Sequence, residues 1–300
     1  MPPELVPQRP EYAAMNPSEW VMQHEAALRL GSFVAVLGAL AIAERISPAR
    51  GDTRPARRQL ANLGLMLINT GLLRLVFPVL AVAVAMSVHS RGGGLFGLLG
   101  LPPWLEIGLT VLVMDAAIYA QHRLLHAVPL LWRMHRVHHS DLGFDVTLGV
   151  RFHPLEMAFS MGVKLGLVYL LGAPALGVVA FEILLAAASL FTHADFAFPP
   201  RVEPWLRAAV VTPSMHRTHH SVLRHETDSN YGFLLSAWDR LFGSYTPLPL
   251  RPEREMPIGL KQWRTPDELG LPALLLQPFR AAPVAGPAPA RFADKETPDA

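Results

Sequence analysis

The chain has 300 residues, of which 51% are hydrophobic and only 17% are charged. This composition favours a membrane protein over a soluble one, because a soluble domain usually carries about 25% charged residues. The formal net charge of +2 gives no sign of nucleic-acid binding, and the lack of cysteine excludes disulfides, thiolate metal sites, iron–sulfur clusters and a cysteine nucleophile.

Long apolar segments follow one another along the chain. Residues 1–20 are rich in proline and polar residues and lack the basic start and apolar core of a cleavable signal peptide, so we expect none. Apolar stretches then occupy about residues 26–43, 61–88, 105–120 and 157–198, and the sequence "GAP" at 172–174 divides the last one into a helical hairpin. Because a helix crosses a bilayer with about 20 apolar residues, we predict an all-α, multi-pass membrane bundle with about four spans.

Arginines predict how this bundle is oriented. Five of them lie between residues 44 and 59, namely Arg45, Arg50, Arg54, Arg57 and Arg58. The positive-inside rule places such a loop in the cytoplasm. Following the spans from there brings His122 and both ends of the 157–198 hairpin to the same side. With a composition rich in alanine, arginine and proline, we expect a bacterial inner-membrane protein that carries a histidine-rich helical cap on its cytoplasmic face.

Histidine is the residue that points to chemistry. Most of the 13 histidines lie between His122 and His225, in the boxes "HRLLH" (122–126), "MHRVHHS" (134–140) and "MHRTHHS" (215–221). Residues three and four apart share one face of a helix, so the three boxes offer eight imidazoles on three faces. A structural zinc site uses four ligands and a catalytic zinc site three, so eight imidazoles predict two metal ions. Imidazole suits zinc, copper, iron and nickel, and the spacing does not choose among them.

The order HxxxH, HxxHH, HxxHH resembles the fatty acid hydroxylase/sterol desaturase superfamily of integral-membrane di-iron oxidases. The similarity extends to "DAAIYAQHRLLH" (115–126), "RFHPLE" (151–156) and "SNYGFLLSAWDRLFGSY" (229–245). The resemblance implies two non-haem iron ions, O2 as co-substrate, and hydroxylation or desaturation of a lipid taken from the bilayer. It also implies an external electron donor, such as a b-type cytochrome, a ferredoxin or a reductase, since no haem, flavin or iron–sulfur motif is evident in the chain.

The predicted metal ligands are nine histidines: His122, His126, His135, His138, His139, His193, His216, His219 and His220. His193 joins the eight box residues because members of the family often carry a histidine at the cytoplasmic end of the hairpin. The two similar heptapeptides are interpreted as two halves of one metal cage, with His138 and His219 near a shared pair of ions. The reaction would take place at the metals, without a separate side-chain nucleophile.

Three further residues are candidates for binding a metal or orienting a ligand. Asp115 lies seven residues before His122 on a similar helix face and could accept the second ring N–H of a ligand histidine. His153 could bind a metal, orient a ligand or begin a helix before Pro154, and Asn230 belongs to the similar segment after the last box. Asp145, Glu156 and Asp239 are weaker candidates for the orienting role.

These features divide the chain into an N-terminal segment with membrane helices (1–104), a histidine-box core (105–250) and a C-terminal extension (251–300), with about the last 20 residues disordered. Two other classes of protein use clustered histidines. A membrane zinc hydrolase could use the same ligands, although no glutamate stands at the spacing of a zinc-protease motif. A haem electron-transfer protein would place its axial histidines singly on facing helices rather than in triads.

Overall fold

All regular elements in the described part of the chain, residues 17–51, 55–77 and 81–282 of a computed structural model, are helices. The α-helices are α1 (Pro17–Gln23), α2 (Glu25–Ile46), α3 (Ala56–Val76), α4 (Ala81–His89), α5 (Gly94–Leu99), α6 (Pro103–Ala127), α7 (Pro129–His139), α8 (Pro154–Leu171), α9 (Ala175–Thr192), α10 (Glu203–Ala209), α11 (Pro213–His219), α12 (Arg224–Thr227), α13 (Ala237–Leu241) and α14 (Leu271–Leu276). Two 3-10 helices, η1 (Val146–Val150) and η2 (Gln277–Phe279), join them. The predicted all-α class is therefore confirmed, whereas the predicted disorder falls almost entirely on residues 283–300, outside the described ranges.

Within the described ranges, five helical stretches are long and apolar enough, by length and composition, to cross a membrane. They are α2, the stretch Ala56–Leu99 that contains α3 to α5, α6, α8 and α9. The sequence predicted about four spans. The count is higher because the two arms of the hairpin, α8 and α9, each have 18 residues and qualify separately.

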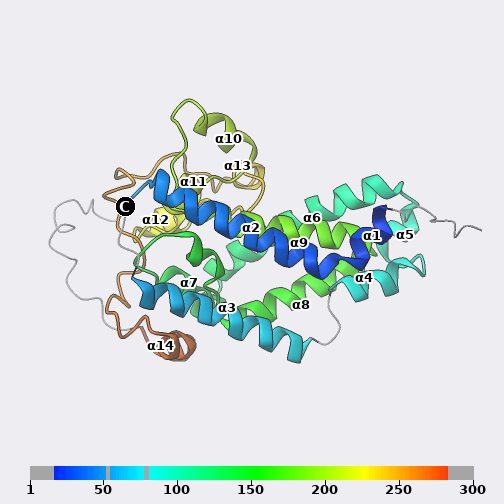
Figure 1. The fold of residues 1–300 in the computed structure, drawn as a ribbon, viewed down its shortest axis with the longest axis horizontal. Coiled ribbons are helices and arrows are strands. Elements are labelled where there is room, and N and C mark those ends of the chain that lie inside the picture. The colour runs from blue at the N-terminus through cyan, green and yellow to red at the C-terminus, as the bar shows by residue number, and fades with distance from the viewer. Residues whose placement is uncertain (1–16, 52–54, 78–80, 283–300) are drawn as a thin grey trace, which may run out of the picture.

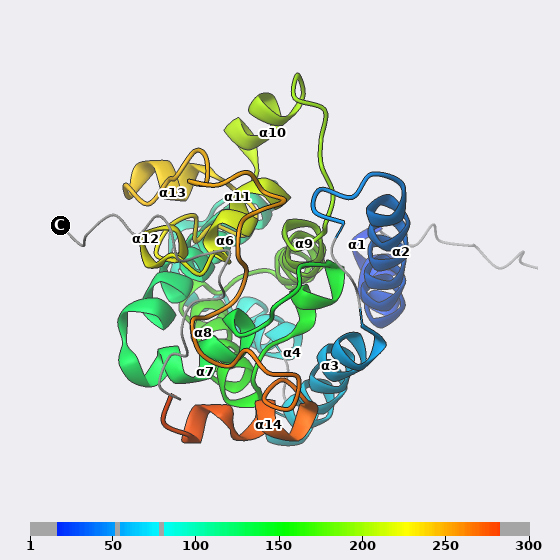
Figure 2. The same ribbon diagram turned by 90° about the vertical axis from the view of Figure 1, so that its left-hand side faces the viewer.

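The long helices lie along the longest axis of the molecule, and α9 packs against α2, α4 and α6 in its interior (Figures 1 and 2). An apolar core formed by Phe96, Val168, Val178 and Phe181 lies towards the end that carries α4 and α5. At this end the α8–α9 turn meets the start of α5 at Gly172. A Cβ atom on Gly172, whose φ is +63°, would lie 1.9 Å from the carbonyl oxygen of Gly93, so only glycine fits.

A cap of short helices closes the opposite end of the bundle. It contains α7 and α10 to α14, on the left of Figure 1 and facing the viewer in Figure 2. Polar contacts join the long helices to this cap. Glu44, near the end of α2, accepts hydrogen bonds from the backbone N–H groups of Val146 (2.6 Å) and Asp195 (2.8 Å). The long helices are therefore held in register with the loops that carry the histidines.

Three of the arginines that predicted the orientation also make tertiary contacts, among them Arg57 with Asp267 (3.4 Å between Nη2 and Oδ1). Arg58 pairs with Asp141 (2.6 Å between Nε and Oδ1) and with Asp145. Arg50 donates a hydrogen bond to the carbonyl oxygen of Met256 (2.7 Å). Arg54 lies outside the described residues. Arg50, in the loop before α3, and Arg58, in the first turn of α3, therefore join this segment to the cap, in addition to any effect on membrane orientation.

Candidate metal centre

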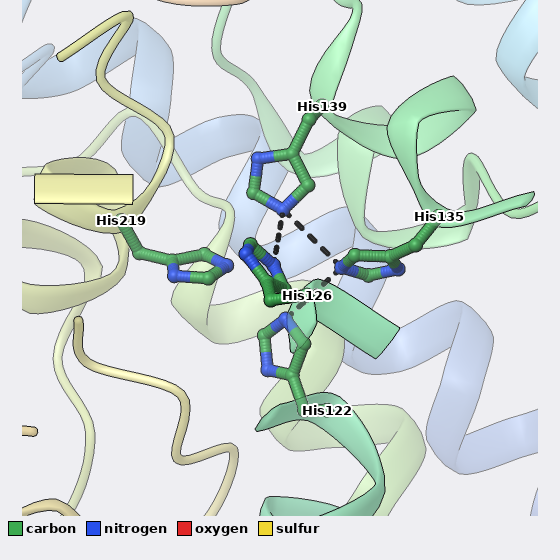
Figure 3. A group of neighbouring side chains, drawn as sticks. All are labelled: His122, His126, His135, His139 and His219. Atoms are coloured by element: carbon green, nitrogen blue, oxygen red, sulfur yellow. Dashed lines mark hydrogen bonds between the residues drawn. The ribbon is translucent and has the colours of Figure 1, made fainter. Parts of the chain in front are cut away.

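The structure buries all nine predicted histidines and gathers them into two groups. The five-histidine group contains His122, His126, His135, His139 and His219, and the four-histidine group contains His138, His193, His216 and His220. Within each group, one ring nitrogen per residue lies within 4.8 Å of every other. Figure 3 shows the five-histidine group, whose rings converge from α6, α7 and α11.

Each of the two heptapeptides contributes to both groups. His135 and His139, four residues apart on α7, belong to the five-histidine group, whereas His138 belongs to the other. The third box has the opposite distribution: His216 and His220 belong to the four-histidine group, whereas His219 belongs to the five-histidine group. The reason is helical geometry, because adjacent residues point about 100° apart around a helix. The paired histidines of each HxxHH box therefore face different groups.

The outer ring nitrogens are held by backbone carbonyl groups. The Nδ1–H groups of four histidines donate to such oxygens: His122 to Tyr231 (2.7 Å), His138 to Arg151 (3.1 Å), His193 to Ser189 (2.6 Å) and His219 to Ser229 (2.7 Å). A carbonyl oxygen can only accept, so Nδ1 must carry the proton and Nε2 of the neutral ring has a free lone pair. The contact therefore fixes both the tautomer and the orientation of each ring.

Two more histidines donate Nδ1–H to a carboxylate. His135 donates to Oε1 of Glu156 (2.8 Å) and His126 to Oδ1 of Asp228 (3.3 Å). This arrangement, an inward Nε2 with an outward N–H on an acceptor, is the usual support of a metal-binding histidine. Glu156 was only a weak candidate from the sequence, and Asp228 was missed because no motif surrounds it.

The inward nitrogens lie as close to one another as the ligands of a shared metal ion. The Nε2 atoms of His138 and His193 are 3.1 Å apart, and those of His122 and His135 are 3.0 Å apart. In neutral rings these pairs would bring two lone pairs face to face. Two nitrogens bound at right angles to one metal at about 2.1 Å lie about 3 Å apart. The donor set thus fits metal ions, and Nε2 of His219 is a further buried nitrogen without a hydrogen-bond partner in the described structure.

Burial keeps these rings neutral. It lowers the pKa of His193 to about 4 and that of His219 to about 3. Burial, followed by the neighbouring imidazoles, also holds the pKa of His138, His216 and His220 well below the usual value. Neutral imidazole is the form that binds metals, so the centre is ready to take up ions at neutral pH.

Asp115 does not orient an imidazole directly, contrary to the expectation. Its carboxylate accepts hydrogen bonds from the backbone N–H of Leu235 (3.1 Å) and from Nε1 of Trp238 (2.8 Å). Seven residues bring it back to the face of His122 but about 10 Å away along the helix, which is too far for contact. Asp115 instead anchors the turn after Tyr231, whose carbonyl group holds His122.

Asn230 and His153 also lie outside both histidine groups. Asn230, with a φ of +51°, donates to the carbonyl oxygens of Met215 (3.1 Å) and Thr246 (2.9 Å) and so holds the loop beside Ser229. His153 caps α8: its Nδ1 accepts the N–H of Leu155 (3.1 Å) and its Nε2 donates to the carbonyl oxygen of Leu275 (3.2 Å). Of the roles left open for His153, the structure shows the helix-start residue.

A cavity of about 290 Å³ inside the bundle reaches His122 and His135 of the five-histidine group. It lies between α2, α3, α6, α8 and α9 and has largely apolar walls, which include Phe33, Leu73 and Leu125. A pocket of this size suits one chain or a small part of a lipid rather than a whole diacyl lipid. The cavity therefore connects the candidate metal centre with an apolar space between the membrane-length helices.

Fold and site together define a helical membrane protein with a buried polyhistidine centre suited to metal ions. Residues 107–244 match the family model described as fatty acid hydroxylase, so this segment of the chain is a fatty acid hydroxylase domain. The segment holds all nine histidines of the two groups. It leaves most of the N-terminal helices and the C-terminal extension outside the match.

Curated relatives agree with this assignment. Ornithine lipid hydroxylase OlsE from Rhizobium tropici is 32% identical over 68% of this chain and 59% of its own length. Alkylglycerol monooxygenase from Xenopus tropicalis is 30% identical over 48% of this chain and 31% of its own, and the enzyme from Homo sapiens is 28% identical over 50% and 33%. The chain thus spans less than two thirds of these relatives. No solved structure matches it significantly.

Proposed function

We propose that the protein is a membrane-bound monooxygenase that hydroxylates a lipid at two non-haem iron ions. The observation that carries the proposal is the pair of buried imidazole groups, with inward lone pairs beside an apolar cavity inside the bundle. The relatives, a lipid hydroxylase and alkylglycerol monooxygenases, favour hydroxylation over desaturation.

Iron fits the donor set and the reaction better than zinc. Five imidazoles in one group exceed the four ligands of a closed zinc site, and zinc has no redox chemistry. Bound iron would supply the activation of O2 that oxidation of an unactivated C–H bond requires. The overall reaction converts C–H, O2, two electrons and two protons into C–OH and water. The electrons would come from an external donor, either a b-type cytochrome, a ferredoxin or a reductase.

The residues of the chain would have distinct parts in this reaction. The nine Nε2 or Nδ1 atoms of the two groups would hold the two ions, while Glu156 and the carbonyl groups keep the rings in place. The cavity would hold the hydrocarbon of the substrate next to His122 and His135 and exclude bulk water. We further propose that the centre faces the cytoplasm of a bacterial inner membrane.

The test is metal analysis combined with a lipid assay on the purified protein in lipid nanodiscs. We expect two iron ions per chain and, with a reduced donor and a lipid extract, O2 consumption together with a product that is heavier by one oxygen atom. His138→Ala should abolish turnover. Stoichiometric zinc and an O2-independent hydrolysis product would instead establish the zinc hydrolase, and a Soret absorbance band would establish the haem protein.

A further inference from the structure

The wall of the cavity near the histidines carries polar side chains on the inward faces of its helices. α6, for example, lines it with Ile118, Gln121, His122 and Leu125, at positions i, i+3, i+4 and i+7. This spacing is that of a single helix face. Gln121 therefore shares the interior face with His122 rather than facing the lipid.

Three oxygen atoms of the side chains that line this cavity have neither a hydrogen-bond partner nor an ion-pair partner in the described structure. They are Oδ1 of Asn69, Oε1 of Gln121 and Oε2 of Glu156. Asn69 and Glu156 are only 5% and 4% exposed. Asn69 donates from Nδ2 to the carbonyl oxygen of Phe152 (2.9 Å), and Oε1 of Glu156 accepts from His135. The remaining oxygen of each side chain is thus free to accept a hydrogen bond.

Lys164, the cationic side chain among the described residues that line the cavity, lies away from the histidines and is paired with an acid. Nζ of Lys164 lies 2.7 Å from Oε1 of Glu182, which Arg29 also contacts (2.5 Å between Nη2 and Oε2). Lys164 follows Glu156 by eight residues on α8, a distance of about 12 Å along the helix axis. Near the histidines the cavity therefore offers hydrogen-bond acceptors and one carboxylate, without a cationic side chain among the described residues to match that carboxylate.

We infer that the cavity binds a lipid that carries a hydroxyl or amine group close to the carbon presented to the histidine centre. The O–H or N–H group would donate to Asn69, Gln121 or Glu156, and the hydrocarbon would lie against apolar residues such as Leu73 and Leu125. A bare methylene chain would leave the buried acceptors unsatisfied, which is costly. A carboxylate or phosphate at this position would face Glu156 and be repelled. That this bound lipid is also the substrate rests on the proposed function.

Equilibrium binding tests the inference without requiring turnover. Purified wild-type protein in nanodiscs of neutral phospholipid is titrated with three lipids of equal chain length. These are a monoacylglycerol with two free hydroxyl groups, the same lipid with one hydroxyl replaced by an amine, and the same lipid with both hydroxyls methylated. We expect the methylated lipid to bind about tenfold more weakly than the donor-bearing lipids. A further preference for the amine would assign the contact to the Glu156 carboxylate, whereas equal binding of amine and hydroxyl would assign it to the amides.

Substitutions in the wall complete the test. Gln121→Met and Asn69→Leu keep side-chain size but remove an acceptor. Each should reduce several-fold the preference for the donor-bearing lipids over the methylated lipid. Gln121→Glu, which keeps acceptor oxygens, should retain it. Leu67→Met, at a site 66% exposed on α3, is the matched control and should bind like wild type. Measurement of each variant's unfolding temperature identifies any that fails to fold.

The inference is overturned if wild type binds all three lipids equally or binds none, or if Gln121→Met and folded Asn69→Leu both retain the full preference. Its failure is separable from failure of the proposed function. Oxygen insertion into a lipid without any binding preference would remove only the inference. A clear preference in a protein that never consumes O2 would remove only the proposed reaction.

Discussion

The chemistry of the candidate centre depends on the outer nitrogen of each imidazole. A backbone carbonyl or a carboxylate accepts the Nδ1–H of six of the nine histidines, and this contact leaves Nε2 free inside. Without such an acceptor a neutral ring can turn or change tautomer. The residues that hold the rings are therefore as important to metal affinity as the rings themselves.

Glu156 provides a direct test of this support. Glu156→Leu removes the acceptor of His135 and should lower metal affinity about 10–100-fold, whereas Glu156→Gln keeps an acceptor oxygen and should lose less. Metal retention during titration with a chelator is the measurement. Asp267→Asn, at an acid whose side chain is 94% exposed, serves as the control. Unchanged retention in Glu156→Leu would show that the contact with His135 does not support metal binding.

The neutral histidines also predict how stability depends on pH. The pKa of His193 is about 4 in the folded protein, against 6.5 for an unperturbed group. Between these values the unfolded chain binds a proton that the folded chain does not, so the free energy of unfolding of the metal-free protein falls as pH falls from about 6.5 to about 4. His193 alone should contribute about 3 kcal/mol to this loss.

The pH effect is measured as the unfolding temperature of metal-free protein between pH 7.5 and 4.5. His193→Asn, which cannot titrate, should show a shallower decrease on acidification. The exposed His24 offers a matched control, since His24→Ala should keep the wild-type pH dependence. A wild-type unfolding temperature that stays level across this range would contradict the prediction.

At the level of elements, the centre depends on two helices that each supply a histidine to the other's group. α7 contributes two histidines to the five-histidine group and His138 to the four-histidine group. The third box, on α11 and the residue after it, contributes two histidines to the four-histidine group and His219 to the five-histidine group. A single helix cannot enclose an ion, because its ligands all lie on one side of it. The two similar boxes form the two groups jointly when α7 and α11 are brought together by the bundle.

The unequal size of the groups gives a prediction for the two crossing residues. His138→Ala leaves three histidines in its group, whereas His219→Ala leaves four in the other. Both substitutions should abolish turnover, but His138→Ala should lose more iron because fewer ligands remain. Iron per chain, measured by plasma emission spectroscopy after identical purification, distinguishes them. Equal loss of both ions in both variants would mean that the groups fill only together.

At the level of the whole molecule, the bundle separates a polar end from an apolar one. The centre lies at the end that carries α7, α11 and α12, and the α4–α5 turn lies at the other (Figure 1). The five membrane-length stretches among the described residues are long enough to carry the chain across a bilayer in alternating directions. Arg58, in the first turn of α3, joins the arginine-rich segment to the cap, so in the orientation proposed from the positive-inside rule this segment and the centre share the cytoplasmic side.

Cysteine labelling tests this orientation, because the chain has no cysteine of its own. Arg224→Cys, at a site whose side chain is 87% exposed on α12, should react with an impermeant maleimide only in inside-out vesicles. Arg91→Cys, exposed at the α4–α5 turn, should react only in right-side-out vesicles. The reverse pattern would place the centre outside, and labelling of both sites from one side would contradict the five crossings.

The sequence by itself determined the all-α class, the membrane-length segments and the nine histidines that gather at the centre. These features depend on local periodicity and residue type, since apolar length predicts a span and the i, i+3, i+4 spacing predicts a shared helix face. Asp115 shows what local periodicity does not predict. Helical spacing placed Asp115 on the face of His122 but did not show that a loop more than 115 residues away would take its carboxylate.

Only the tertiary structure decided how the boxes interleave, which acceptors hold the rings and which polar atoms line the cavity. These outcomes depend on contacts between residues far apart in the chain, such as His138 with His193 and His135 with Glu156. The angle between adjacent histidines on a helix requires that they diverge, but the packing of α7 against its neighbours determines what each one meets. For the same reason, the free acceptors near the centre became visible only when the faces of α2, α3, α6, α8 and α9 closed around one cavity.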